Sequence, residues 1–170
     1  MPSVDALVLF FTSSILLALA PGPDNLFVMI QAAQRGRMAG LAVTLGLCTG
    51  LLVHTTAVAF GLAVVFQASA LAFNLLKYAG AAYLLYLAWG AFTAGDSDSG
   101  DSRAVDLSFA RLYRRGIIMN VTNPKVSIFF LAFLPQFADP QNGPLALQII
   151  LLGALFILAT ILIFGGISLL

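Results

Sequence analysis

The stretch Ala20-Pro21-Gly22-Pro23-Asp24-Asn25 interrupts an otherwise apolar run that extends from residue 4 to residue 33. Its two prolines, glycine and carboxylate would break an ordinary membrane helix, because proline lacks a backbone donor and clashes with the preceding turn. A later apolar run carries a similar interruption at Asn123-Pro124-Lys125. Two apolar segments broken at corresponding points are typical of secondary transporters whose helices restart inside the membrane.

The composition is that of an integral membrane protein. Hydrophobic residues make up 61% of the 170 positions and charged residues only 9%, against about 45–50% and about 25% in soluble domains. No basic tract is present to bind nucleic acid. With one cysteine (Cys48), one histidine (His54) and no glutamate, neither a CxxC pair nor a usual metal-ligand set can be assembled. We therefore expect no metal, no cofactor and no enzymatic activity.

Five apolar runs are each long enough to cross about 30 Å of hydrocarbon at about 1.5 Å per residue. They cover residues 4–33, 38–66, 70–92, 115–137 and 144–170. The sequence therefore predicts an all-α integral membrane protein, with a single domain over 1–170 and five transmembrane helices in the lipid bilayer. The first and fourth helices are predicted to be broken at the proline motifs.

The arginines predict the orientation of these spans. Arg35 and Arg37 lie in the turn between the first two spans, and four more lie in or beside the polar stretch 93–114: Arg103, Arg111, Arg114 and Arg115. The loops at the opposite ends contain no basic residue. Because cytoplasmic loops are enriched in Lys and Arg, we predict that the arginine side is cytoplasmic and that the N-terminus is outside.

An internal repeat is suggested by the two proline motifs. Pro23-Asp24 and Pro124-Lys125 lie 101 residues apart. We predict a first repeat over 1–92, a cytoplasmic loop over 93–114 and an incomplete second repeat over 115–170. Because three spans is an odd number, the second repeat enters from the other face, as in inverted-repeat transporters. The chain is then 3+2 of an inverted 3+3 plan, and we expect the last helix of the second repeat to be missing.

Both interruptions are predicted to lie near the middle of the bilayer. Asp24 is 11 residues from Arg35, and Lys125 is 10 residues from Arg115, or about 16 Å and about 15 Å at helical rise. Gly22 and Asn123 are plausible N-caps. Pro23 and Pro124 would then occupy the first helical position, where a missing N–H does no harm. The positive dipole ends of two half-helices would therefore point at the centre.

Such a centre suits the two ends of an amino acid. The helix ends and Lys125 would attract a carboxylate, while Asp24 could hold an ammonium group or exchange a proton. Asn25 and Asn123 complete the predicted substrate-binding or proton-coupling set, and Asn120 is a further candidate. The alternative is that Pro21, Pro23 and Pro124 only kink the helices and that an Asp24–Lys125 ion pair fixes their packing.

Three other polar residues are weaker candidates. For His54 a hydrogen bond between helices is preferred over a proton relay. For Lys77, snorkelling to the outer interface is preferred over substrate contact. Tyr83 reads first as an interfacial anchor. Glycines at Gly36, Gly40, Gly46 and Gly50 recur at a spacing that allows close helix packing.

At these residues the sequence resembles the LysE/RhtB superfamily of bacterial amino-acid exporters. The matching signatures are Pro21-Gly22-Pro23-Asp24-Asn25, the turn Gly36-Arg37-x-x-Gly40, Lys77-x-x-Gly80-Ala81-Ala82-Tyr83-Leu84, Asn123-Pro124-Lys125 and Phe133-Leu134-Pro135-Gln136-Phe137. They follow one another over nearly the whole chain. The resemblance implies an inner-membrane protein, driven by the proton gradient, that exports amino acids or derivatives such as homoserine, threonine, leucine or lysine.

The resemblance also implies about six hydrophobic segments, one more than this sequence contains. The alternative is therefore that the chain is a truncated membrane fragment, or an assembly partner, that does not itself transport. The sequence does not determine the oligomeric state, and a homo-oligomer is one of the alternatives. The sequence likewise leaves open which amino acid is moved.

Overall fold

The computed structural model describes residues 1–68, 70–93 and 108–170, and these residues form helices and connecting loops without a strand. The α-helices are α1 (Val4–Leu19), α2 (Pro23–Arg35), α3 (Arg37–Ala68), α4 (Ala70–Thr93), α5 (Phe109–Thr122), α6 (Pro124–Ile128) and α7 (Leu145–Leu169). A π-helical turn, η1 (Phe129–Phe133), and two 3-10 turns, η2 (Leu134–Phe137) and η3 (Pro140–Asn142), connect α6 to α7. The predicted all-α class is confirmed for the part of the chain described.

Both predicted helix breaks are confirmed. α1 ends at Leu19 and α2 begins at Pro23, with a bend of 60° between them. α5 ends at Thr122, and the helix that restarts at Pro124 is bent by 50° from it. As predicted, Gly22 and Asn123 are the N-cap residues of the restarted helices.

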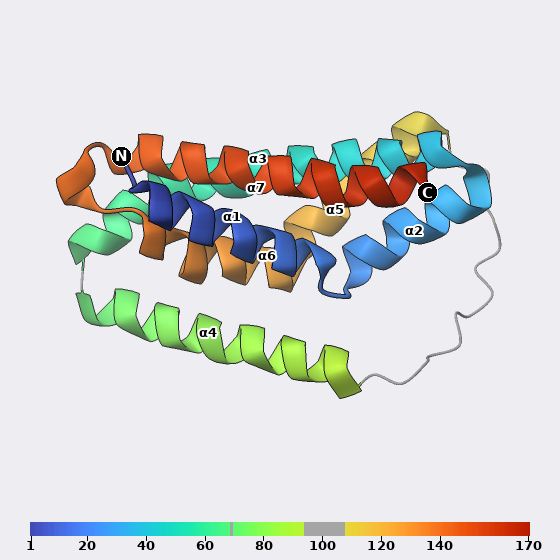
Figure 1. The fold of residues 1–170 in the computed structure, drawn as a ribbon. Helices are drawn as coiled ribbons and strands as arrows, with labels where there is room; N and C mark the ends of the chain where they lie inside the picture. The colour runs from blue at the N-terminus through green and yellow to red at the C-terminus, as the bar shows by residue number, and fades with distance from the viewer. Residues whose placement is uncertain (69, 94–107) are drawn as a thin grey trace.

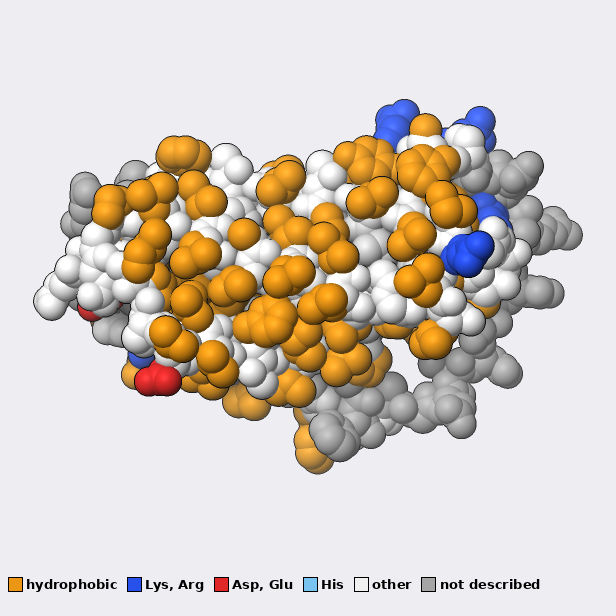
Figure 2. Space-filling model, turned by 45° about the horizontal axis from the view of Figure 1, so that its top comes forward, with side chains coloured by type: hydrophobic (Ala, Val, Ile, Leu, Met, Phe, Trp, Pro, Cys, Tyr) orange, Lys and Arg blue, Asp and Glu red, His pale blue; other side chains and the backbone are white. Residues whose placement is uncertain are grey.

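Within the described part of the chain, two unbroken helices are long and apolar enough to cross a membrane, α3 over Arg37–Gly61 and α7 over Leu145–Leu169. Each bent pair adds one more span if its two helices are counted together. α4 corresponds to the expected third span, and its crossing of the membrane stays a prediction, as does the total of five. Large apolar side chains are exposed along the bundle (Figure 2), as expected of a surface that faces lipid.

The arginine-rich segments gather at one end of the bundle. The turn after α2 and the start of α5 lie at the same end in Figure 1, and most of the Lys and Arg side chains visible in Figure 2 are found at one end. Within the predicted loop 93–114, residues 94–107 lie outside the described residues, Arg103 included. α5 begins at Phe109, six residues before the expected fourth span.

The two bent pairs run in opposite directions along the bundle (Figure 1). The long helix that follows each pair packs against the first helix of the other pair: α3 against α5, and α7 against α1. This reciprocal packing agrees with an inverted arrangement, while the full 3+3 repeat stays a prediction. α4 packs mainly against η1, with fewer contacts to α3 and α6.

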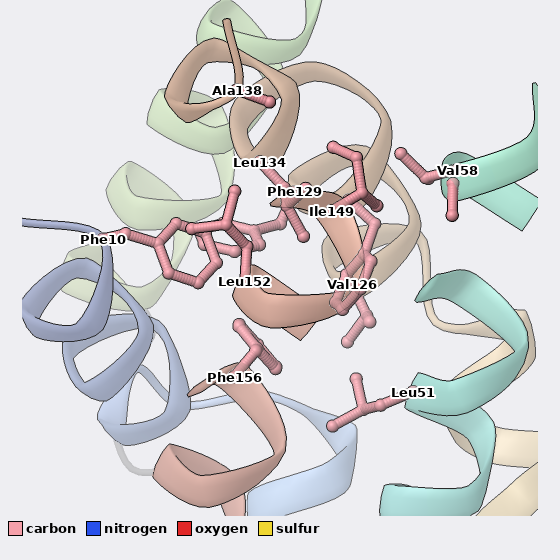
Figure 3. Close-up of a cluster of buried hydrophobic side chains, with 12 residues drawn as sticks. Phe10, Leu51, Val58, Val126, Phe129, Leu134, Ala138, Ile149, Leu152 and Phe156 are labelled. Carbon is pink, nitrogen blue, oxygen red and sulfur yellow. The ribbon is translucent and has the colours of Figure 1, made fainter. Parts of the chain in front are cut away.

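The main apolar core surrounds the second break and the facing helices (Figure 3). Phe10 of α1, Leu51 of α3, Phe129 of η1 and Phe156 of α7 are among its buried members. The Phe129 and Phe156 rings lie 5.0 Å apart between centroids. The packing of aromatic rings from elements far apart in sequence fixes the position of the restarted helix.

Glycines bring α3 and α5 into backbone contact. A Cβ atom added at Gly46 would lie 2.1 Å from the Tyr113 carbonyl oxygen, and one at Gly116 would lie 2.5 Å from the Val43 carbonyl oxygen. The prediction of close packing is thus confirmed for Gly46. It was wrong for Gly36, which caps α2 with a φ of 81° and, among the residues described, has no neighbour that a side chain would meet. The left-handed conformation of this turn explains that glycine.

Candidate functional site

The first break is held by side chains that come from beyond it. The last carbonyl groups of a helix have no partner within the helix, and two here receive side-chain donors. Asn25 Nδ2 donates to the Ala18 carbonyl at 2.5 Å, and Lys125 Nζ donates to the Ala20 carbonyl at 2.8 Å. A Cβ atom at Gly22 would lie 3.3 Å from Lys125 Nζ. Gly22 therefore leaves space for the lysine to reach the end of α1.

Asp24 stands in the first turn of α2 and is buried, with 5% of its surface exposed. Its Oδ2 atom accepts a long hydrogen bond, 3.5 Å, from Asn120 Nδ2 of α5. Its Oδ1 atom is buried and has no hydrogen-bond partner within the described part of the chain. A buried carboxylate oxygen without a donor is costly, so this atom marks a place where a donor would be bound.

Asn120 is positioned by two residues of α3. A Cβ atom at Gly50 would lie 2.7 Å from both Cβ and Oδ1 of Asn120, so Gly50 provides the space that the amide occupies. His54, one turn further along α3, donates from Nε2 to the Asn120 carbonyl at 3.2 Å. The preferred prediction for His54, a hydrogen bond between helices, is confirmed.

The second break is capped locally. Asn123 is 4% exposed, and its Oδ1 atom accepts from the Lys125 backbone N–H at 3.0 Å. The Asn123 N–H donates to the Asn120 carbonyl at 3.1 Å. The second break therefore satisfies the unpaired backbone groups at its helix ends with nearby residues to a greater extent than the first break does.

A small cavity lies between the two breaks. Its lining residues come from α1, α2, α5, α6 and α7: Leu17, Ala18, Asp24, Asn25, Asn120, Lys125, Val126, Phe156, Thr160 and Phe164. Its volume is about 20 Å³, which is enough for one water molecule. Polar groups from both halves of the chain thus meet in one small, mostly apolar cavity.

The cavity brings together four of the predicted site residues: Asp24, Asn25, Asn120 and Lys125. Asp24 and Lys125 make no direct ion pair; each is bonded to another group, Asn120 and the Ala20 carbonyl respectively. Asn123 and His54 contact these residues without lining the cavity. Thr160, buried on α7, was missed by sequence reasoning, because a lone threonine in an apolar helix gives no signal of its own.

The weaker candidates on α4 lie elsewhere. Lys77 Nζ is 5.2 Å from the centroid of the Tyr78 ring on its own helix. The Tyr83 ring is 6.2 Å from that of Tyr86. Neither Lys77 nor Tyr83 lines the cavity between the breaks.

Comparison with known proteins identifies the family. Residues 15–170 match the family described as LysE type translocator. A homoserine/homoserine lactone efflux protein of Salmonella typhimurium is 37% identical over 157 residues, which cover 92% of this chain and 76% of the relative. A leucine efflux protein of Salmonella choleraesuis is 30% identical over 138 residues, which cover 79% of this chain and 65% of the relative.

An uncharacterized membrane protein of Vibrio cholerae is 32% identical over 133 residues, which cover 78% of this chain and 65% of the relative. No solved structure gives a significant match. The family match extends over nearly the whole chain and includes both helix breaks and every polar residue that lines the cavity. This chain therefore belongs to the LysE type translocator family.

Proposed function

We propose that this protein exports amino acids or close derivatives across the bacterial cytoplasmic membrane, through the cavity between its two helix breaks. The relatives that are named for homoserine, homoserine lactone and leucine efflux support this choice of substrate. The observation that carries the proposal is Asp24, a buried carboxylate with one unpartnered oxygen, which shares a cavity with Lys125.

The energetic cost of these charges supports a transport role. A charged side chain near the centre of a bilayer costs at least about 2.5 to 3.5 kcal/mol, and such residues usually mark substrate or ion pathways. Asp24 and Lys125 are not paired with each other, so a purely structural ion pair does not account for them. In our proposal Asp24 binds the substrate or exchanges a proton during the cycle, and the proton gradient drives export.

The size of the cavity implies that substrate passage involves a change of shape. An amino acid needs several times the volume of the single water molecule that about 20 Å³ would admit. We propose that the two bent helix pairs separate alternately, first toward one face of the membrane and then toward the other, as in transporters with inverted repeats. The arginines at one end support a cytoplasmic position for the turn after α2 and an outside N-terminus.

The test is efflux from proteoliposomes loaded with labelled homoserine or leucine. Asp24→Asn and Lys125→Ala are expected to lower the initial rate by tenfold or more, since a hydrogen bond to a charged group contributes about 1.5 to 3 kcal/mol. Asp5→Asn, an exposed carboxylate on the same helix pair, is the matched control and should keep the parental rate. An imposed pH gradient should accelerate efflux, and a protonophore should abolish that acceleration.

Two results would contradict the proposal in different ways. Parental rates in both Asp24→Asn and Lys125→Ala would exclude the cavity as the transport site. Failure of the parent protein to release any amino acid in a broad panel would favour the non-transporting role of an assembly partner.

A further inference from the structure

The cavity between the breaks offers oxygen acceptors that have no donor. Asp24 Oδ1, Asn25 Oδ1 and Asn120 Oδ1 are all buried, and none has a hydrogen-bond partner among the residues described. All three residues line the same cavity. Asp24 and Asn120 are 5% and 2% exposed. Buried acceptors are normally satisfied, so three on one small cavity indicate a ligand that brings several N–H donors.

The donor groups of Lys125, Asn25 and Asn120 each already make a hydrogen bond. The Lys125 ammonium donates to the Ala20 carbonyl, and the Lys125 backbone N–H donates to Asn123 Oδ1. The amide groups of Asn25 and Asn120 donate to the Ala18 carbonyl and to Asp24. A carboxylate could use only the N–H groups that these donors have left over, whereas an ammonium group would supply the three acceptors that have no donor at all.

The helix ends point to the same conclusion. The positive end of α2 has Asp24 in its first turn, where a carboxylate offsets the dipole. Lys125 lies against the carbonyl end of α1, where a cation is favourable for the same reason. The positive end of α2 and the Lys125 ammonium are therefore both partly compensated within the protein.

We infer that the site recognises its substrate by the ammonium group, through the side-chain oxygens of Asp24, Asn25 and Asn120, and that it does not require a free carboxylate. This inference rests on the proposed function and names the class of substrate: small primary amines, including amides and cyclic esters of amino acids. Homoserine lactone, named for one relative, has an ammonium group and no carboxylate. Lys125 serves to hold the end of α1.

The test is equilibrium binding to the purified protein in nanodiscs, so that it does not depend on transport. Leucine and homoserine are each compared with two analogues of the same skeleton. The amide keeps the ammonium group and lacks the carboxylate. The 2-hydroxy acid keeps the carboxylate and lacks the ammonium group. The amides are expected to bind within about threefold of the amino acids. The hydroxy acids are expected to bind at least tenfold more weakly.

A variant separates recognition from a general loss of structure. In Asp24→Asn the preference for the amide over the hydroxy acid is expected to fall at least tenfold, whereas a merely structural defect would weaken both ligands equally. Hydroxy acids that bind as well as the amino acids, amides that fail to bind, or a preference unchanged in Asp24→Asn would each overturn the inference. Preferential binding of the amines without efflux would support the inference and contradict the proposed function.

Discussion

The two helix breaks have the same plan and different chemistry. In each, a proline begins the restarted helix and a charged residue follows it, Asp24 in the first and Lys125 in the second. The first break extends over three residues and its N-cap, Gly22, has no side chain to cap the helix. The second consists of Asn123 alone, whose side chain caps the helix that follows.

This difference shows that the first break depends on the second. The Ala20 carbonyl is satisfied by Lys125, a residue 105 positions away. At the second break, the Asn120 carbonyl receives both His54 and the nearby Asn123 N–H. The basic residue of the second break thus links the two breaks, and three substitutions test that dependence.

The largest effect is expected from Lys125→Met, which keeps an unbranched side chain and removes the donor to the Ala20 carbonyl. Loss of a hydrogen bond to a charged group should lower the free energy of unfolding by about 2 kcal/mol. Unfolding in mixed micelles measures this loss of stability. Lys77→Met is the matched control, expected to stay within about 0.5 kcal/mol, and Lys125→Arg should recover part of the loss. An unchanged stability for Lys125→Met would show that the first break does not need the second.

A smaller effect is expected from Asn123→Ala, which removes the local cap of the second break. Loss of an N-cap side chain typically costs about 1 kcal/mol, and the same unfolding assay should detect it. Asn123→Ser keeps a capping oxygen and is expected to retain most of the stability. If the serine variant were as unstable as the alanine variant, the asparagine would be needed for something other than capping.

The smallest effect is expected from His54→Leu. The Asn120 carbonyl then keeps its bond from the Asn123 N–H, so the loss should be about 0.5 kcal/mol, at the lower end for a neutral hydrogen bond. Thr56→Val, at an exposed position on the same helix, is the control. A loss as large as that of Lys125→Met would mean that both breaks depend equally on distant residues.

The breaks themselves were predictable because they follow from local backbone chemistry. Proline at 23 and 124 fixes where a helix can restart, and the residues before them, Gly22 and Asn123, are suitable caps. The meeting of Asp24 and Lys125 at one cavity was expected from their similar distance to the arginines at one end of the bundle. These features depend on a few residues and on helical rise.

What the sequence did not reveal depends on packing between distant segments. The partner of Lys125 is a backbone carbonyl, and no side-chain pattern indicates which carbonyl a lysine will reach. Thr160 enters the cavity only because α7 packs beside α1 and α2. The π-helical turn at Phe129–Phe133 lies within an apolar run whose sequence is typical of a regular helix. Gly36 was assigned to helix packing because spacing alone does not distinguish a packing glycine from a cap.

The direct contact of the α3 and α5 backbones at Gly46 and Gly116 constrains how such a protein can move. Because no side chain separates the two backbones at this contact, the helices have little freedom to slide, and we expect them to behave as one rigid body. Any rocking or hinge motion that admits a solute would then take place in α1, α2, α6 and α7 around that fixed frame.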